Sequence, residues 1–136
     1  MDKVAAIRDC YERHNRGDQR GWLEFFDDDI VFSTQGIRFM RETRLVGKEP
    51  VVAWFIDYFE AFREYEFLIE DVTEVGGDWV LAVAPVRGVG HHSGIEFGHL
   101  GVACYRFSDG KIVEFHTFGS RDAALSMLRS PGTDAP

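Results

Sequence analysis

The chain has 136 residues, of which 45% are hydrophobic and 14% aromatic, and its formal net charge is −8. This length predicts one domain that buries roughly two-thirds of its unfolded surface. The acidic balance and the scattered Lys and Arg residues argue against a nucleic-acid partner, because phosphate binding requires a basic stripe.

The two cysteines and the chain ends also limit the possibilities. Cys10 and Cys104 are too few for a disulfide framework, which favours the reducing cytoplasm. No apolar signal segment opens the chain, and no apolar run approaches the roughly 18 residues needed to cross a bilayer. We therefore expect a cytoplasmic protein with no membrane partner. Residues 1–129 are predicted to form one domain, and 130–136 a disordered tail of Pro, Gly and small polar residues.

The first predicted element is an amphipathic helix. Asp2 can cap its start, and Gly17 can end it in the left-handed conformation. A short second helix is expected over 20–26, followed by a strand over 30–34. The apolar face of the first helix, with residues spaced by three and four, consists of Val4, Ile7, Cys10, Tyr11 and His14.

The middle of the chain contains an irregular segment and a long helix. Residues 35–46 show no clear period and are predicted to form a loop or an irregular hairpin. The next helix begins near Lys48, since Pro50 is tolerated in a first turn. Its circumference is mostly apolar, which predicts burial on several sides. The apolar residues are Val51, Val52, Trp54, Phe55, Ile56, Tyr58, Phe59 and Phe62.

Four strand-like segments follow, over 65–75, 78–88, 95–107 and 111–119. Gly76-Gly77-Asp78 and Ser108-Asp109-Gly110-Lys111 are hairpin signals between neighbouring segments. Strands joined by tight turns pair antiparallel, so we expect a meander. A last helix is predicted over 121–129.

Both faces of the segment 95–107 have an apolar centre, so both should be covered. One face carries His99 and Tyr105 and would meet the helices and a pocket. The other carries Leu100, Val102 and Cys104 and would meet a second copy of the chain. The pattern therefore predicts a homodimer through the outer sheet face.

Five short motifs follow one another along the chain with characteristic gaps. They are Tyr11-Glu12-Arg13-His14-Asn15-Arg16-Gly17-Asp18, Phe26-Asp27-Asp28-Asp29-Ile30, Gly47-Lys48-Glu49, Arg87-Gly88 followed by Ser93-Gly94-Ile95, and Asp109-Gly110-Lys111-Ile112-Val113. By these motifs the chain, from about residue 4 to 129, resembles the nuclear transport factor 2-like superfamily, and within it the SnoaL-like group of polyketide cyclases and uncharacterised bacterial proteins. This resemblance implies an α+β fold, a cone-shaped barrel in which a strongly bent antiparallel sheet wraps around helices, usually in a homodimer. It also implies a deep cavity between the helices and the sheet.

For each known reaction of the superfamily, this chain lacks at least one of the residues that the reaction requires. Ketosteroid isomerases hold a tyrosine and an aspartate where this chain has Cys10 and Thr34. Cyclases of the SnoaL-like group often place a histidine and a carboxylate where Ala103 and Ser120 stand. Limonene-type epoxide hydrolases need an Asp–Arg–Asp arrangement, and no aspartate follows Arg87 at the expected spacing.

His99 is the best candidate for a catalytic residue. It shares a strand face with Phe97 and Tyr105, where its imidazole could act as a general base or bind the polar end of a ligand. The alternative is a core histidine satisfied by a neighbour. Tyr105 could orient a ligand carbonyl or fill the core, and Arg87 could clamp a carboxylate or face solvent.

The first and third helices add candidates that are a mixture of core and cavity wall. No metal site is expected, because His91-His92 has no ligand partners at suitable spacing. We interpret His116 and Glu114 as polar residues of the dimer surface. The predicted ligand-binding set is Tyr11, His14, Trp54, Tyr58, Arg87, His99 and Tyr105.

These residues favour a pocket protein that binds a small hydrophobic organic molecule, with no cofactor and an unknown reaction. One alternative is a cofactor-independent isomerase, cyclase or hydratase, with His99 as base and with Tyr105 and Arg87 stabilising negative charge. The other is a dimerising interaction module with a filled pocket. An open cavity would favour the first two hypotheses and a filled one the third.

Overall fold

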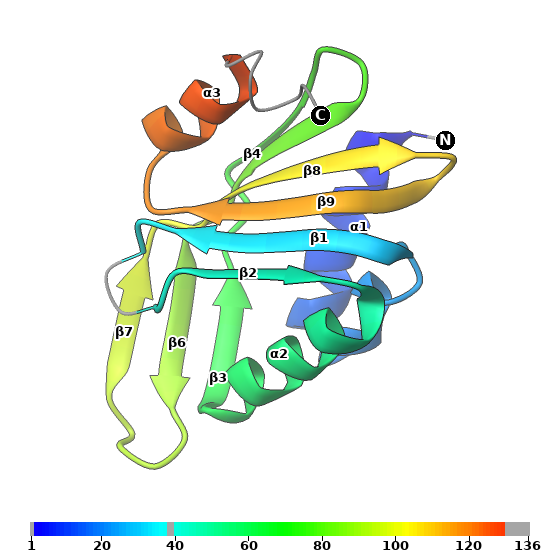
Figure 1. Ribbon diagram of the computed structural model, residues 1–136. Helices are drawn as coiled ribbons and strands as arrows, with labels where there is room; N and C mark the ends of the chain where they lie inside the picture. The colour runs from blue at the N-terminus through cyan, green and yellow to red at the C-terminus, as the bar shows by residue number, and fades with distance from the viewer. Residues whose placement is uncertain (1, 38–39, 130–136) are drawn as a thin grey trace.

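The computed structural model describes residues 2–37 and 40–129, so the predicted tail 130–136 lies outside the described residues (Figure 1). The helices are α1 (Lys3–Asn15), the short 3-10 helix η1 (Gln19–Trp22), α2 (Lys48–Glu60) and α3 (Arg121–Arg129). The strands are β1 (Phe26–Gln35), β2 (Thr43–Val46), β3 (Phe62–Phe67), β4 (Asp71–Val75), β5 (Trp79–Val83), β6 (Val86–Gly90), β7 (Glu96–His99), β8 (Val102–Ser108) and β9 (Lys111–Phe118). This is the predicted α+β fold with a strongly curved sheet. None of the described helices is long and apolar enough to span a bilayer.

Helix α1 forms as predicted, because its cap and its apolar spacing agree. The Asp2 side chain accepts a hydrogen bond from the Ala5 backbone N–H at 3.0 Å, which satisfies a donor left unpaired at the helix start. Gly17 follows the helix with φ at +94°, a conformation that glycine adopts without steric cost. The buried residues of the helix are Ile7, Cys10, Tyr11 and His14.

The strands form a six-stranded sheet in the order β2-β1-β9-β8-β5-β4 and a three-stranded sheet in the order β3-β6-β7. The predicted antiparallel meander is present, since β9 pairs with β8, β8 with β5 and β5 with β4. Between β4 and β5, Gly76 and Gly77 have φ at +64° and +86°, as the predicted tight hairpin requires. Strand β1 pairs in parallel with β9, and no local pattern in the sequence predicts this pairing.

Three of the four predicted long strands are each broken in two, which corrects the expectation of continuous strands. The first becomes β3 and β4, the second β5 and β6, and the third β7 and β8. At the break, the Ala84 N–H donates to the Gly101 carbonyl at 2.7 Å, and a Cβ on Gly101 would lie 2.4 Å from the Ala84 oxygen. Pro85 follows and has no N–H to continue the ladder. The chain therefore bends at one level in three neighbouring strands, and this bend separates the two sheets.

Two other local predictions are corrected or narrowed. The helix expected over 20–26 is only the single 3-10 turn η1, and Phe26 begins β1. For 35–46, the hairpin alternative is right, because β2 pairs antiparallel with β1. The expectation that α2 is buried on several sides is wrong. Val51 is its buried residue, whereas Ile56 is 55% exposed, because α2 packs on β1, β2 and β3 with one side.

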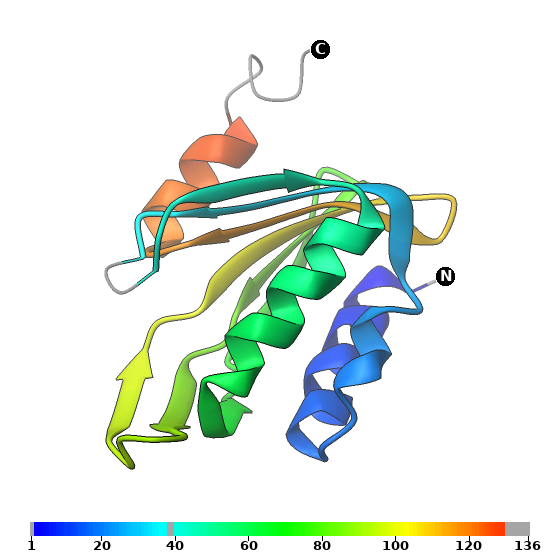
Figure 2. The same cartoon turned by 60° about the horizontal axis from the view of Figure 1, so that its bottom comes forward.

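The six-stranded sheet separates two apolar clusters. The inner cluster, under α1 and α2, includes Phe32, Tyr105 and Phe115, and the outer one lies under α3 (Figure 2). Val102 and Cys104 belong to the outer cluster and are 1% and 0% exposed within the single chain. The expectation that they form the open apolar centre of a dimer surface is therefore wrong, because the chain's own C-terminal helix covers them.

Candidate ligand-binding site

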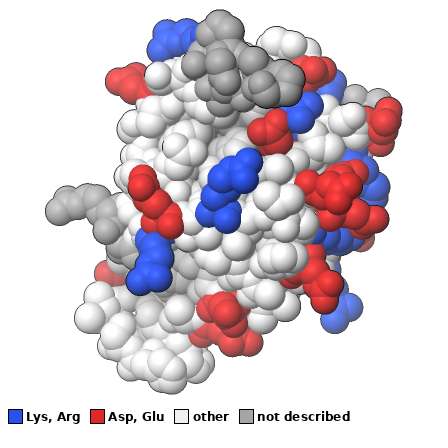
Figure 3. Space-filling model, in the orientation of Figure 1, with Lys and Arg blue, Asp and Glu red and all other residues white. Residues whose placement is uncertain are grey.

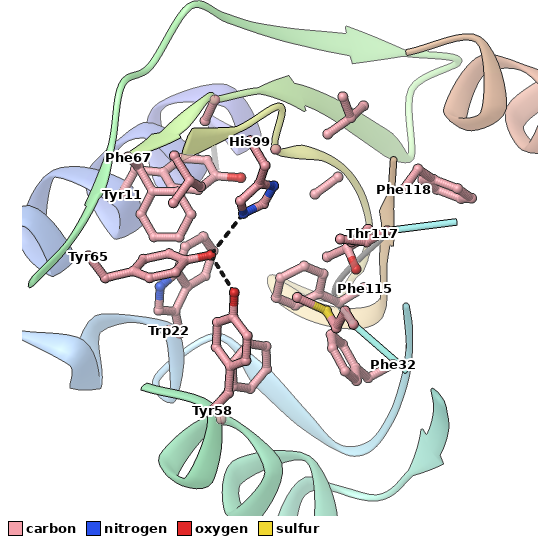
Figure 4. Close-up of a pocket in the computed structure, with 18 of the residues that line it drawn as sticks. Tyr11, Trp22, Phe32, Tyr58, Tyr65, Phe67, His99, Phe115, Thr117 and Phe118 are labelled. Carbon is pink, nitrogen blue, oxygen red and sulfur yellow. Dashed lines mark hydrogen bonds between the residues drawn. The ribbon is translucent and has the colours of Figure 1, made fainter. Parts of the chain in front are cut away.

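A cavity of about 70 Å³ lies between the inner face of the sheets, α1 and α2 (Figure 4). Its wall is formed mainly by aromatic rings from α1, η1, α2 and the strands on both sides of the bend. Five of the residues predicted for the site line it: Tyr11, Trp54, Tyr58, His99 and Tyr105. Because β7 and β8 meet at the bend, His99 and Tyr105 enter the same cavity from different sheets.

A chain of hydrogen bonds crosses the cavity wall (Figure 4). The hydroxyls of Tyr58 and Tyr65 lie 2.8 Å apart, and the Tyr65 hydroxyl lies 3.4 Å from His99 Nε2. His99 Nδ1 lies 3.3 Å from the Leu100 carbonyl oxygen. A carbonyl oxygen only accepts, so this contact requires the proton on Nδ1 and leaves Nε2 as an acceptor for the Tyr65 O–H. The chain thus holds protons that can be rearranged between two phenols and one imidazole.

Burial sets the protonation states of this chain. It lowers the pKa of His99, because desolvation disfavours the imidazolium. It raises the pKa of Tyr58 to about 12 and raises the pKa of Tyr65 further. At neutral pH the imidazole is therefore neutral and both phenols keep their protons. Among the described lining residues none is Asp, Glu, Lys or Arg, so the site offers neutral hydrogen-bonding groups.

A second pair of phenols lies elsewhere in the cavity wall. The hydroxyls of Tyr11 and Tyr105 are 2.7 Å apart and both residues are buried. Burial raises the pKa of both. Trp22 stacks on the Tyr105 ring at a centroid distance of 5.6 Å. Two phenols carry two O–H groups and one bond uses one of them, so this pair retains a second O–H that it does not use itself.

His14 does not line the cavity, although the sequence predicts it for the site. It is 3% exposed, and its Nε2–H donates to the Tyr65 backbone carbonyl at 3.1 Å. Its Nδ1 is buried and has no hydrogen-bond partner among the described residues. Burial lowers the pKa of His14. The residue therefore lies behind the cavity wall, where it contacts the strand that carries Tyr65.

Arg87 also lies outside the cavity. Its side chain is 47% exposed and its Nη2 pairs with Glu96 Oε1 at 3.0 Å, across neighbouring strands of the three-stranded sheet. The predicted carboxylate clamp is therefore absent from this site, and the solvent-facing alternative holds. Strand alternation could not decide this, since it separates two faces without showing which one meets the cavity.

Tyr65 lines the cavity and joins the hydrogen-bonded chain, but the sequence did not predict it for the site. It lies in β3 between the exposed residues Glu64 and Glu66. This alternation of exposed and less exposed residues predicts an inward-facing side chain, and it is the sequence feature from which Tyr65 could have been predicted. The contact with His99 could not be foreseen, because it joins residues 34 positions apart.

Three positions at which the family resemblance implies chemistry carry side chains that contact the backbone in this chain. The Cys10 thiol is buried against the Gly21 carbonyl, at 3.8 Å, and burial raises its pKa to about 12. The Thr34 hydroxyl donates to the Arg41 carbonyl at 2.8 Å. Ser120 caps α3 by accepting from the Ala123 N–H. Within residues 2–37 and 40–129, no three His, Cys, Asp or Glu side chains are placed to hold a metal.

A polar chain of a different kind lies on the outer face of the six-stranded sheet. Ser33 Oγ is 2.6 Å from His116 Nδ1, and His116 Nε2 is 2.9 Å from Glu114 Oε1. The Arg106 Nε–H donates to the other Glu114 oxygen. The hydrogen bond with His116 and the neighbouring Arg106 lower the pKa of Glu114. The sequence interpretation placed His116 and Glu114 on this face, as members of a dimer surface.

The chain matches the SnoaL-like domain family over residues 7–115 and belongs to that family. A candidate polyketide cyclase from Xanthomonas campestris pv. campestris is 21% identical, with a TM-score of 0.72 over 90% of this chain and 93% of that chain. A nuclear transport factor 2-like protein of unknown function from Burkholderia pseudomallei is 18% identical, with a TM-score of 0.74 over 96% and 100%.

A third structure contains a ligand. It is a Mycobacterium tuberculosis protein in complex with estradiol-17β-hemisuccinate, 22% identical, with a TM-score of 0.72 over 88% of this chain and 94% of that chain. At these identities the likeness shows the fold alone. No curated protein sequence matches the chain.

Proposed function

We propose that the protein binds a small, largely apolar organic molecule in the cavity, with one oxygen atom of the ligand at the Tyr58–Tyr65–His99 chain. The observation that carries the proposal is this hydrogen-bonded chain in a wall that is mainly apolar. Cavities of this composition bind by apolar burial and use a few polar groups to fix orientation. The estradiol hemisuccinate complex of the M. tuberculosis protein supports a ring-containing ligand for this fold.

The ligand end that enters the cavity is uncharged. The described lining holds no ionic partner, and a buried charge without a partner is costly. A phenol or alcohol suits the chain, because the two phenol protons and the imidazole proton are used within it and the Tyr58 and Tyr65 oxygens can still accept from a ligand O–H. We assign His14 a positioning role, in which its bond to the Tyr65 carbonyl holds the strand that presents the phenol.

Calorimetric titration with 4-hydroxybiphenyl tests this function. Tyr65→Phe removes one hydroxyl and keeps the ring, so the affinity should fall about fivefold, the equivalent of one hydrogen bond of about 1 kcal/mol. Thr73→Val, which removes a hydroxyl from an exposed position of β4, should leave the affinity unchanged. Absence of binding, or equal affinity in the wild type and Tyr65→Phe, would contradict the proposal.

Acid–base catalysis is the second candidate, and the lowered pKa of His99 favours it. When the Tyr65 O–H turns from His99 Nε2 to a ligand carbonyl, the neutral imidazole can take up a proton at Nε2 from the carbon next to that carbonyl, and the Tyr65 O–H stabilises the enolate. Deuterium exchange of 2-tetralone in D2O, followed by NMR, measures this step. The wild type should accelerate the exchange and His99→Gln should not. Exchange at the uncatalysed rate in both proteins would exclude this catalysis and leave ligand binding as the proposed function.

We also propose a homodimer through the outer face of the six-stranded sheet. The face seen in Figure 3 is uncharged over much of its area, with a basic side chain near its centre, and Val46 at its β2 edge is 56% exposed. Exposed apolar side chains bordered by polar ones suit a two-fold contact. Sedimentation equilibrium at micromolar concentration should show a dimer, and a monomer would contradict the proposal.

We propose a cytoplasmic location for the protein. The two buried free cysteines suit the reducing conditions there.

A further inference from the structure

The cavity is small compared with a ring-sized ligand. Its volume is about 70 Å³, whereas a protein cavity that holds benzene measures about 150 Å³. The cavity therefore takes the oxygen end and a few carbon atoms of a ligand such as 4-hydroxybiphenyl. The remaining atoms need a second apolar space that continues from the first.

Such a space adjoins the cavity. A groove of about 450 Å³ is lined by residues of α2 and of the segment that follows α1. Its wall is mainly apolar, with Leu23 on one side and Val52 and Ile56 on the other. Asp18 and Arg20 also line the groove. Because their charges are opposite, they favour neither an anionic nor a cationic ligand.

Three aromatic side chains form a divider between the two spaces. Trp22, Phe55 and Phe59 line both the cavity and the groove. The Phe59 ring lies 5.1 Å from the Tyr65 ring, measured between centroids. The divider therefore lies next to the hydrogen-bonding chain, between the oxygen end of a bound ligand and the groove.

We infer that the groove between α2 and residues 17–23 is the outer half of the binding site, and that the ligand is an elongated, uncharged molecule of at least two rings. This inference rests on the proposed function, since the inner oxygen is held by the Tyr58–Tyr65–His99 chain. The outer ring occupies the groove against Val52 and Ile56, and the Trp22–Phe55–Phe59 divider packs around the middle of the molecule. A compact ligand of equal size does not fit this shape.

Two isomers of one composition test the shape. 4-Hydroxybiphenyl is linear and 2-hydroxybiphenyl is bent, so both bring the same apolar area and one hydroxyl. The wild type should bind the linear isomer at least about tenfold more tightly, since burial of the outer ring is worth that much or more. Ile56→Glu should abolish this preference by placing a carboxylate in the groove, and it should preserve the fold because Ile56 is 55% exposed. Leu68→Glu, at a residue that is 48% exposed and lines neither space, is the matched control.

The outcomes separate the two proposals. If neither isomer binds, or if Tyr65→Phe affects neither, the proposed function fails. If both bind with equal affinity and depend on Tyr65, but Ile56→Glu has no effect, the function stands and the elongated site is wrong. Loss of the linear preference in Ile56→Glu and its retention in Leu68→Glu support the inference.

Discussion

Two histidines on opposite sides of the molecule show how the surroundings set the role of one residue type. His99 meets phenols and aromatic rings in the cavity wall, and burial lowers its pKa. His116 lies on the outer face between a serine and Glu114, and Arg106 holds the same carboxylate. The inner site is uncharged among the described residues, whereas the outer chain contains ions. Apolar ligands suit the first environment, and a second protein surface suits the second.

The outer face itself has two parts, and a pair of charged substitutions distinguishes them. Val102 is 1% exposed beneath α3, whereas Val46 is 56% exposed. Val102→Lys buries an ammonium without a partner and should lower the free energy of unfolding by about 4 kcal/mol. Val46→Lys should leave stability within about 0.5 kcal/mol of the wild type and weaken the dimer.

Urea unfolding and sedimentation equilibrium measure the two effects. A stable Val102→Lys protein would show that α3 does not seal this part of the sheet. A Val46→Lys protein that remains a dimer at all accessible concentrations would exclude this edge from the interface. Both results would remove the distinction between a covered and an open part of the outer face.

The second prediction concerns the charged chain on the outer face. Glu114 is 24% exposed by its side chain and accepts from both Arg106 and His116. Glu114→Gln removes the charge but keeps the shape, and it should lower the free energy of unfolding by about 2 kcal/mol, since hydrogen bonds to charged groups are worth about 1.5–3 kcal/mol.

The pH dependence of that loss has a defined sign. The pKa of Glu114 is lower in the folded state, so its stabilisation is complete above the unfolded pKa of about 4.3 and is lost as the pH falls through the folded pKa. The difference between wild type and Glu114→Gln should therefore shrink between pH 6 and pH 3. Urea titrations at both pH values measure it, and a constant difference would contradict the assignment.

The sequence was informative where local rules decide the structure. The cap at Asp2, the three-and-four spacing of Ile7 and Tyr11 and the glycines of the β4–β5 turn are local features, and each formed as predicted. The bend was missed because strand alternation continues across it, so that His99 and Tyr105 keep the same parity. Pro85 and Gly101 were the signals for the break.

The site was only partly predictable for the same reason. Residues that face the cavity follow from alternation and helical spacing, which placed Tyr11, Tyr58 and His99 in its wall. Partner choice does not follow from either, because Tyr65 reaches His99 across the bend and His14 reaches the Tyr65 carbonyl. Such contacts depend on the angle between the two sheets, and no local sequence pattern predicts that angle.

The smallest predicted effect concerns His99 and returns to the comparison of the two histidines. Its folded pKa lies below the unfolded value of about 6.5. Above that pH both states are neutral and the titration of His99 does not change the stability. As the pH falls below it, the unfolded state takes up a proton first, so the free energy of unfolding decreases until the folded pKa is reached.

Between pH 7.5 and pH 5.5 the free energy of unfolding should therefore fall less in His99→Gln than in the wild type. The difference is at most about 1.4 kcal/mol, because pH 5.5 lies one unit below the unfolded pKa and one unit is worth that much. His14 also has a lowered pKa, but it is present in both proteins and cancels in the difference. An NMR titration of the His99 ring should give a midpoint below about 6.5. A midpoint at the unfolded value would show that His99 is as solvated as an exposed histidine. The contrast between an uncharged inner site and an ionic outer face would then lose its basis.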